Sequence, residues 1–177
     1  MGERFEKFGL TLNLDKTWLI EFGRFAAIDR QRRGEDRPET FDFLGFTHCC
    51  GTSRQGQFRV IRLTAKKRMR ATLAAIRAAL MRRRHESISV IGPWLNRAVQ
   101  GYFNYHAVPT NLIRLDGFRS EVCRAWRHAL LRRSQRHRWD WDRFNRLATR
   151  FVPYPRKLHD YPERRFHASH HRQEPMR

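Results

Sequence analysis

With 177 residues, of which 40% are hydrophobic and 12% aromatic, the chain has enough apolar material to fold, which argues against wholesale disorder. Its formal net charge is +20, and 32 of its 37 basic residues are arginine. Since a guanidinium group pairs bidentately with phosphate and stacks on bases, this composition predicts a nucleic acid as the partner. An anionic membrane surface and an acidic protein are the alternatives that charge alone leaves open.

Other classes of protein lack their signals in this sequence. No apolar run is long enough to span a bilayer, and residues 1–5 hold no apolar signal core, so we expect a cytoplasmic protein without a membrane partner. Cys49, Cys50 and Cys123 show no C-x-x-C spacing, and we expect neither a disulfide framework nor a metal site. Phosphate-binding glycine loops are missing too. The closest carboxylate pairs, Glu35-Asp36 and Asp140/Asp142, are interpreted as part of a polar loop and of a helix start, so the sequence predicts no catalytic residue and no cofactor.

The charge divides the chain into two parts. Residues 1–50 hold 8 Lys and Arg against 9 Asp and Glu, whereas residues 51–177 hold 29 against 8. The first part has the pattern of a helix end closed by Gly9, a strand pair, a polar loop and a second hairpin. We expect these elements at residues 3–9, 10–22, 29–39 and 41–63.

From Thr64 onward the apolar residues recur with a helical period. Met69, Leu73, Ile76 and Leu80 form one stripe of a first helix that ends near residues 82–84. Three further helices are expected: from Pro93 to before Pro109, from Asn111 to residues 132–136, and a short one from Asp140.

The predicted fold class is therefore mainly α with a small β part. It consists of two antiparallel β-hairpins, a three-helix bundle, a short C-terminal helix and an irregular tail. We expect domains at residues 1–63, 64–137 and 138–177, with the last ten residues disordered.

Basic residues interleaved with aromatic ones indicate the nucleic-acid contacts. Residues 64–84 contain no acid, whereas an inert surface mixes charges of both signs. We expect Tyr102 and Trp126 to be buried, and Tyr105 and Trp139 to be exposed for stacking. The basic candidates are Lys66, Lys67, Arg70, Arg77, Arg97, Arg124, Arg132, Arg133 and Arg136.

Short motifs in a fixed order carry a family resemblance. They are Phe8–Asn13 leading to Lys16-Thr17, Phe41–His48, Leu95-Asn96 with Gly101–Tyr105, Leu131–Arg136, and Pro153–Arg156 followed by His159–Phe166. Over nearly its whole length the chain resembles the C-terminal part of a group II intron-encoded reverse transcriptase, or maturase. The first two motifs resemble the sixth and seventh conserved blocks, at the end of the palm. The helical motifs resemble the maturase-specific thumb.

The resemblance implies roles for several residues. Lys16 corresponds to a lysine near the phosphates of the incoming nucleotide, and Phe43-Leu44-Gly45 to the loop that supports the primer end. The Tyr-x-Asp-Asp motif of the family lies upstream of its sixth block, and this sequence begins after it. Since phosphoryl transfer needs those metal-holding carboxylates, we expect no polymerase activity from this chain by itself.

The leading hypothesis is an RNA-binding, maturase-type fragment that is not an enzyme. It would bind intron RNA or a primer–template duplex and assist RNA splicing. In one alternative it is part of a split RNA-directed DNA polymerase of a mobile genetic element, completed by an upstream half that carries the aspartates and Mg²⁺. In the other it is a decayed fragment without function. The sequence leaves the oligomeric state open.

Overall fold

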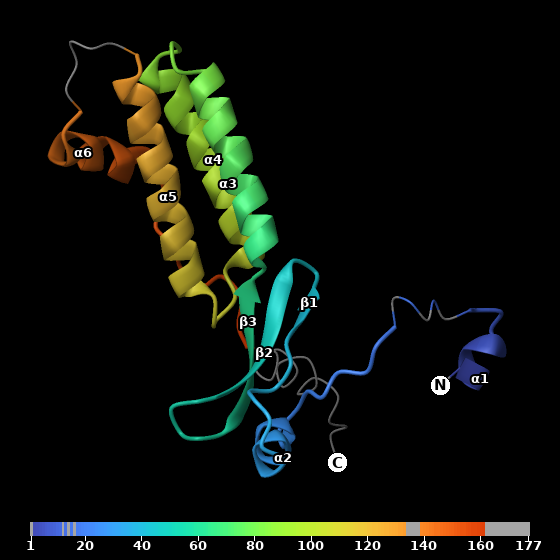
Figure 1. Cartoon of the computed structure of the whole chain (residues 1–177). Coiled ribbons are helices and arrows are strands. Elements are labelled where there is room, and N and C mark those ends of the chain that lie inside the picture. The colour runs from blue at the N-terminus through green and yellow to red at the C-terminus, as the bar shows by residue number, and fades with distance from the viewer. Residues whose placement is uncertain (1, 12, 14, 16, 134–138, 162–177) are drawn as a thin grey trace, which may run out of the picture. The chain divides into compact units, whose positions relative to one another are not determined.

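The computed structural model describes residues 2–11, 13, 15, 17–133 and 139–161 (Figure 1). Its fold is mainly α with a small β part, which confirms the predicted class. The elements are α1 (Gly2–Glu6), α2 (Ala26–Arg32), β1 (Phe41–Phe43), β2 (Phe46–Thr52), β3 (Phe58–Thr64), α3 (Lys66–Arg82), α4 (Ile88–His106), α5 (Leu112–Leu131) and α6 (Trp141–Phe151). None of the helices in the described ranges is both long enough and apolar enough to cross a membrane.

The chain divides into two compact units. The first, here called the N-terminal unit, comprises Met1–Phe41 and Cys49–Val60. The second, called the helical unit, comprises Asp42–His48 and Ile61–Arg177. The domain limits expected after residues 63 and 137 stay predictions.

Two helices of the N-terminal unit end at left-handed glycines. After α1, Gly9 has φ 67°, and its amide donates to the carbonyl of Glu6 at 3.0 Å. After α2, Gly34 has φ 71°, and its amide donates to the carbonyl of Gln31 at 3.1 Å. Gly9 therefore closes a helix as predicted. The loop prediction for residues 29–39 was wrong for residues 29–32, which belong to α2. Polar side chains dominate this segment, so the helix that ends just before Gly34 was not predicted.

The first of the two expected hairpins is not formed. None of the described residues between 10 and 22 lies in a strand. Trp18 and Leu19 are 71% and 99% exposed, so their apolar side chains have no surface on which to pack. Strand pairing is stabilised chiefly by packing of this kind, and local β propensity alone did not produce it.

The second expected hairpin is present as part of a three-stranded antiparallel sheet. The strand order is β1-β2-β3. Between β2 and β3 the amide of Ser53 donates to the carbonyl of Gln57 at 2.7 Å, and Gly56 takes φ 76°. The run of residues 41–48, expected as one strand of that hairpin, is divided by a tight turn at Leu44-Gly45 into β1 and the start of β2.

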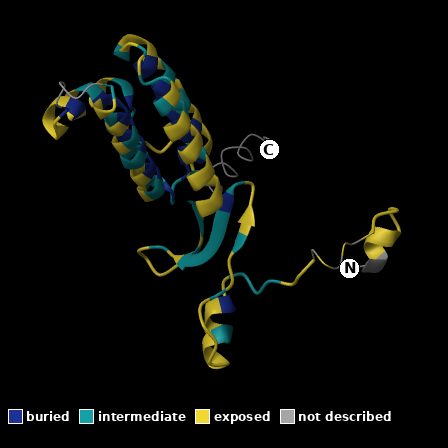
Figure 2. Ribbon diagram, turned by 45° about the horizontal axis from the view of Figure 1, so that its top comes forward, coloured by how far each residue is buried: buried dark blue, intermediate teal, exposed yellow. Residues whose placement is uncertain are grey.

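The core of the helical unit lies between α3, α4 and α5, which alternate in direction (Figure 1). Figure 2 shows their buried faces turned toward one another and their exposed faces turned outward. Tyr102 and Trp126 are buried as predicted, and the rings of Tyr102 and Phe118 stack at 3.8 Å between centroids. The predicted stripe of α3 is confirmed, with Leu73, Ile76 and Leu80 buried.

The C-terminal segment is fastened to this bundle. The side chain of Asp140 accepts a hydrogen bond from the amide of Arg143 at 2.7 Å and caps α6, as its position predicted. Beyond α6 the chain is irregular as far as residue 161, and the amide of Leu158 donates to the carbonyl of Ala107 at 3.1 Å. The last ten residues, for which disorder was expected, lie outside the described residues.

Candidate nucleic-acid interface

The turn between β1 and β2 presents two apolar side chains to solvent. Leu44 has φ 48° and Gly45 has φ 78°, the signs that a type I′ hairpin turn requires at its two central positions. Phe43 is 59% and Leu44 68% exposed. A leucine rarely adopts the left-handed conformation, so contacts outside the turn must hold it in place.

Tyr105, near the end of α4, supplies such a contact. Its hydroxyl donates to the carbonyl of Leu44 at 2.6 Å, and its ring stacks on Phe46 with 5.6 Å between centroids. A Cβ placed on Gly45 would lie 3.8 Å from the same ring. Tyr105 nevertheless remains 52% exposed, as the sequence predicted. The structure thus brings Phe43, Leu44, Gly45 and Tyr105 together, although the last is distant in sequence.

The first turns of α3 carry an unusual concentration of positive charge. Lys66, Lys67, Arg68 and Arg70 are exposed, and the first turn contains no acid. A helix N-terminus already bears partial positive charge, so each cation there costs about 0.3–1 kcal/mol at low ionic strength. Ala65, at the N-cap position, offers no side-chain cap. This arrangement disfavours the isolated helix and favours a bound anion.

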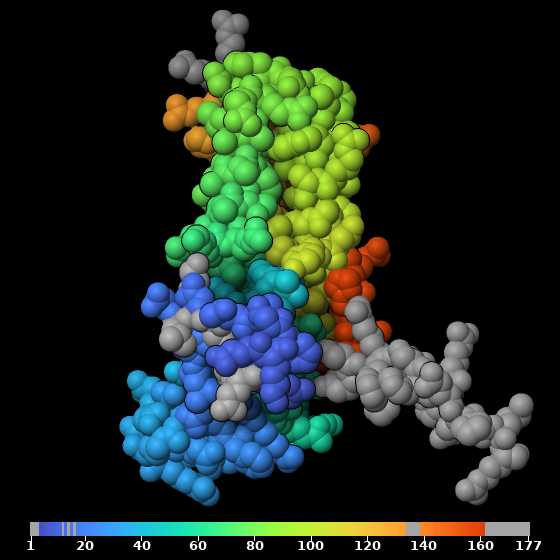
Figure 3. Space-filling view, turned by 90° about the vertical axis from the view of Figure 1, so that its right-hand side faces the viewer, coloured from blue at the N-terminus to red at the C-terminus, as the bar shows by residue number. Residues whose placement is uncertain are grey.

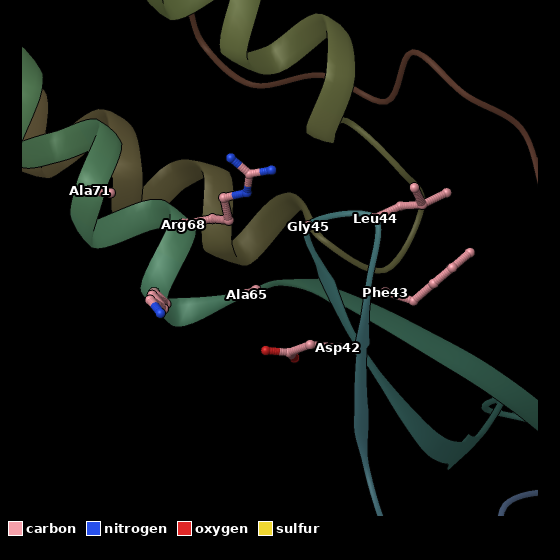
Figure 4. A pocket seen from close by; sticks show the side chains of 8 residues that line it. Asp42, Phe43, Leu44, Gly45, Ala65, Arg68 and Ala71 are labelled. Atoms are coloured by element: carbon pink, nitrogen blue, oxygen red, sulfur yellow. The ribbon is translucent and has the colours of Figure 1, made fainter. Parts of the chain in front are cut away.

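A pocket of about 460 Å³ joins the turn to the start of α3 (Figure 4). It is lined by Asp42, Phe43, Leu44, Gly45, Ala65, Lys67, Arg68 and Ala71. Figure 4 shows the side chains of Asp42 and Phe43 on opposite sides of β1. The Asp42 carboxylate accepts a hydrogen bond from the Thr47 hydroxyl at 2.5 Å. The pocket therefore combines two cations, one acid and exposed apolar surface.

Two predicted contacts, Arg77 on α3 and Arg124 on α5, share one carboxylate. An Arg77 Nη2 lies 2.6 Å from Glu121, and Arg124 also pairs with that residue. Both arginine side chains are more than half exposed, so each keeps donors available to solvent. Arg97 and Arg132 are exposed, and Arg133 donates to the carbonyl of His85 at 3.4 Å.

The prediction that Trp139 is exposed was wrong. Its side chain is 9% exposed and belongs to the apolar core, and the Arg143 guanidinium lies 4.8 Å above the ring. Since Asp140 caps α6 immediately afterwards, the residue before the cap packs onto the core together with that helix. The predicted contacts Lys16 and Arg136 lie outside the described residues.

Arg68 is a basic residue of the pocket that the sequence analysis missed, as it missed Asp42, Ala65 and Ala71. In the helical pattern it is one cation among several, and only the nearness of the turn distinguishes it. Three arginines that were not among the predicted contacts are engaged within the fold. Arg83, Arg119 and Arg127 lie over Trp94, Tyr154 and Trp141, with 4.9, 3.6 and 4.5 Å from guanidinium carbon to ring centroid.

Several charges of the N-terminal unit are paired with one another. Arg33 forms ion pairs with Glu21 and Glu35, and Arg30 lies 3.3 Å from Glu35. Hydrogen bonding to Arg33 lowers the pKa of the Glu35 carboxyl. Residues 1–50 are nearly neutral because they hold 8 basic and 9 acidic residues, so the acid-free start of α3 is the stronger attractor of phosphate.

No protein family, curated protein or solved structure matches this chain. Within the described ranges, no group of three or more His, Cys, Asp or Glu side chains is placed to hold a metal ion.

Proposed function

We propose that this protein binds structured RNA and acts as a maturase-type fragment of a group II intron reverse transcriptase. The observation that carries the proposal is the acid-free start of α3 beside the exposed turn at residues 43–45. We further propose that it works in the cytoplasm on intron RNA or a primer–template duplex.

The chemistry of this surface suits RNA. Lys66, Lys67, Arg68 and Arg70 can neutralise backbone phosphates, and exposed apolar and aromatic side chains can pack on riboses or unpaired bases. In this proposal the protein stabilises a folded RNA and thereby assists splicing, while the RNA performs the reaction. The chain is not an enzyme by itself, and Mg²⁺ would act only in a completed polymerase.

Binding of a structured RNA at increasing salt concentration tests the proposal. The logarithm of the affinity should fall linearly with the logarithm of salt concentration, with a slope corresponding to roughly five or more neutralised phosphates. A variant carrying Lys66→Gln, Lys67→Gln and Arg70→Gln should lose affinity and reduce the slope by about 2–3.

The matched control removes the same charge from exposed positions elsewhere, with Arg32→Gln, Arg37→Gln and Arg54→Gln. It should retain most of the affinity and slope. Equal losses of RNA affinity in the two triple variants would show that net charge alone attracts RNA. An affinity that does not change with salt concentration would overturn the proposal.

A split polymerase is the second candidate, and exposed apolar residues of the N-terminal unit favour it. Phe8, Trp18, Leu19 and Phe25 are 74%, 71%, 99% and 63% exposed. Apolar exposure of this extent is typical of a surface that another chain covers. Primer extension separates the two candidates. The chain alone should give no extension, and extension upon adding a chain that carries the catalytic aspartates would establish the split enzyme.

The third hypothesis, a decayed fragment without function, predicts poor folding. Unfolding in urea tests it. A cooperative transition, as the buried core of the helical unit leads us to expect, argues against decay.

A further inference from the structure

One face of α4 forms an exposed stripe that leads to the candidate interface. Pro93, Arg97, Gly101, Asn104 and Tyr105 are exposed, at spacings of four, four, three and one residues. These spacings place them along one side of a helix. Tyr105 ends the stripe at the turn of residues 43–45 through its hydrogen bond to Leu44. Figure 3 shows α3 and α4 side by side on this face of the helical unit.

Gly101 interrupts this stripe in the middle of a 19-residue helix. Glycine there is less favourable than alanine, because it orders a freer backbone and leaves that backbone open to solvent. A Cβ built on Gly101 would meet nothing within 4 Å. Packing within the described structure therefore gives no reason for the missing side chain.

Gly92, on the same helix, is a glycine that packing requires. A Cβ there would lie 2.6 Å from the ring of Phe151, so the close approach of α6 requires glycine. Gly101 has no such neighbour among the described residues. None of the residues that the structure describes fills the space next to it.

We propose that the sugar–phosphate backbone of bound RNA lies against α4 at Gly101, which is a close-approach position. This inference rests on the proposed RNA-binding function. Arg97 and Tyr105 stand one turn before and one turn after the glycine, about 12 Å apart at 1.5 Å per residue. The cation of Arg97 and the ring of Tyr105 thus flank the backbone of Gly101, which carries no side chain. An RNA strand presents phosphates and 2′-hydroxyls along its backbone, and these suit such a flat, polar-edged surface.

Gly117 on α5 provides a matched contrast. It too lies inside a helix, is exposed, and would place a Cβ in open space. Four residues before and four residues after it stand Ile113 and Glu121, in place of the cation and the ring that flank Gly101. The two glycines share their local geometry and differ in the side chains that flank them.

The experiment compares Gly101→Ala and Gly101→Leu with Gly117→Ala and Gly117→Leu in the full chain. The affinity for one structured RNA at fixed salt and the midpoint of thermal unfolding are measured for each. Both alanine variants should melt about 2–4 °C higher, because alanine favours the helix. Gly101→Ala should bind RNA about tenfold more weakly, because the added methyl group holds the strand away from Arg97 and Tyr105; tenfold corresponds to about 1.4 kcal/mol. Gly101→Leu should bind more weakly still, and the Gly117 variants should bind like the unsubstituted chain.

The outcomes distinguish this inference from the proposed function. A Gly101→Ala variant that binds RNA normally overturns the close-approach role and leaves the proposed function intact. Equal losses at Gly101 and Gly117, or a lower melting temperature for Gly101→Ala, also overturn that role. If the unsubstituted chain does not bind structured RNA, both the inference and the proposed function fail.

Discussion

The hydroxyl of Tyr105 donates a hydrogen bond to the backbone carbonyl of Leu44 at 2.6 Å, across 61 residues of sequence. Leu44 is also the non-glycine residue that takes a positive φ in the described ranges. The strained residue and the residue that holds it are thus directly bonded. A strained backbone that holds an exposed apolar side chain in a fixed position is typical of binding sites.

Leu44→Asn should stabilise the protein and weaken RNA binding. Asn-Gly is the preferred pair for a type I′ turn, so relief of the strain at Leu44 should add about 0.5–1 kcal/mol to the free energy of unfolding. The loss of the exposed apolar side chain should lower RNA affinity. Urea titration and an RNA-binding assay on the same variant measure the two effects. A destabilised variant would show that the leucine side chain packs more than its exposure indicates.

Tyr105→Phe tests the partner in this pair. The ring and its stacking on Phe46 remain, whereas the hydrogen bond to Leu44 is lost. We expect a loss of about 0.5–1.5 kcal/mol in unfolding free energy, measured by urea titration. In the background of Leu44→Asn the effect should be smaller, because asparagine accepts the left-handed conformation without help; equal effects in the two backgrounds would contradict coupling.

Asn111 links β3 to the helices and should be among the most sensitive polar residues. Its side chain is fully buried, accepts from the amide of Thr64 at 2.8 Å, and donates to the Thr64 hydroxyl and the His106 carbonyl. Asn111→Ala leaves these groups without partners and should cost about 2–4 kcal/mol. Replacement of Thr110, a less buried neighbour, by alanine should lower the free energy of unfolding by a smaller amount. A neutral Asn111→Ala variant in urea titration would mean that water replaces the amide.

Stability should depend on pH through His106. Burial lowers the pKa of its imidazole, the charge of Arg68 lowers it further, and the hydrogen bond to the Tyr102 carbonyl partly opposes this. Because the folded pKa lies below the unfolded value of about 6.5, the unfolded chain takes up the proton first as pH falls. Stability should therefore decrease as pH falls through about 6.5 and level off below the folded pKa.

The measurement is the urea midpoint between pH 8 and pH 5. His106→Gln should flatten this dependence. If the urea midpoint of His106→Gln still decreases as pH falls, other groups cause the effect.

Gly92→Ala should destabilise the contact between α4 and α6. The added methyl would lie 2.6 Å from the ring of Phe151, and overpacking of this kind costs about 1–3 kcal/mol. Phe151→Leu in the same chain should recover part of the loss, which urea titration of a double-mutant cycle measures. Additive effects would show that the helix shifts to accommodate the methyl independently of the ring.

Periodic patterns predicted α3, α5 and the core well, because the buried stripe of α3 and the ring of Trp126 depend on spacing and size. They missed α2, and α4 begins at Ile88 instead of Pro93, which lies inside that helix. Polar residues whose side chains can hydrogen-bond to more than one group were harder to interpret. Thr64 and Asn111 have the sequence of helix caps, but neither helix start shows a side-chain cap, and these two side chains bond each other instead. Exposure of Trp139 and the role of Arg68 depend on which segments meet, and one sequence does not reveal that.

The three cations in the first turn of α3 have a consequence for the amount of protein that persists in a cell. Mutual repulsion and the helix dipole destabilise the free chain, and a polyanion bound there relieves both. Binding to the folded state would then add directly to stability, so that under the proposed function molecules without RNA would unfold more often and meet proteases more often. Chains made in excess of such a polyanion should be degraded first, and the steady-state abundance of the protein should follow the supply of that polyanion.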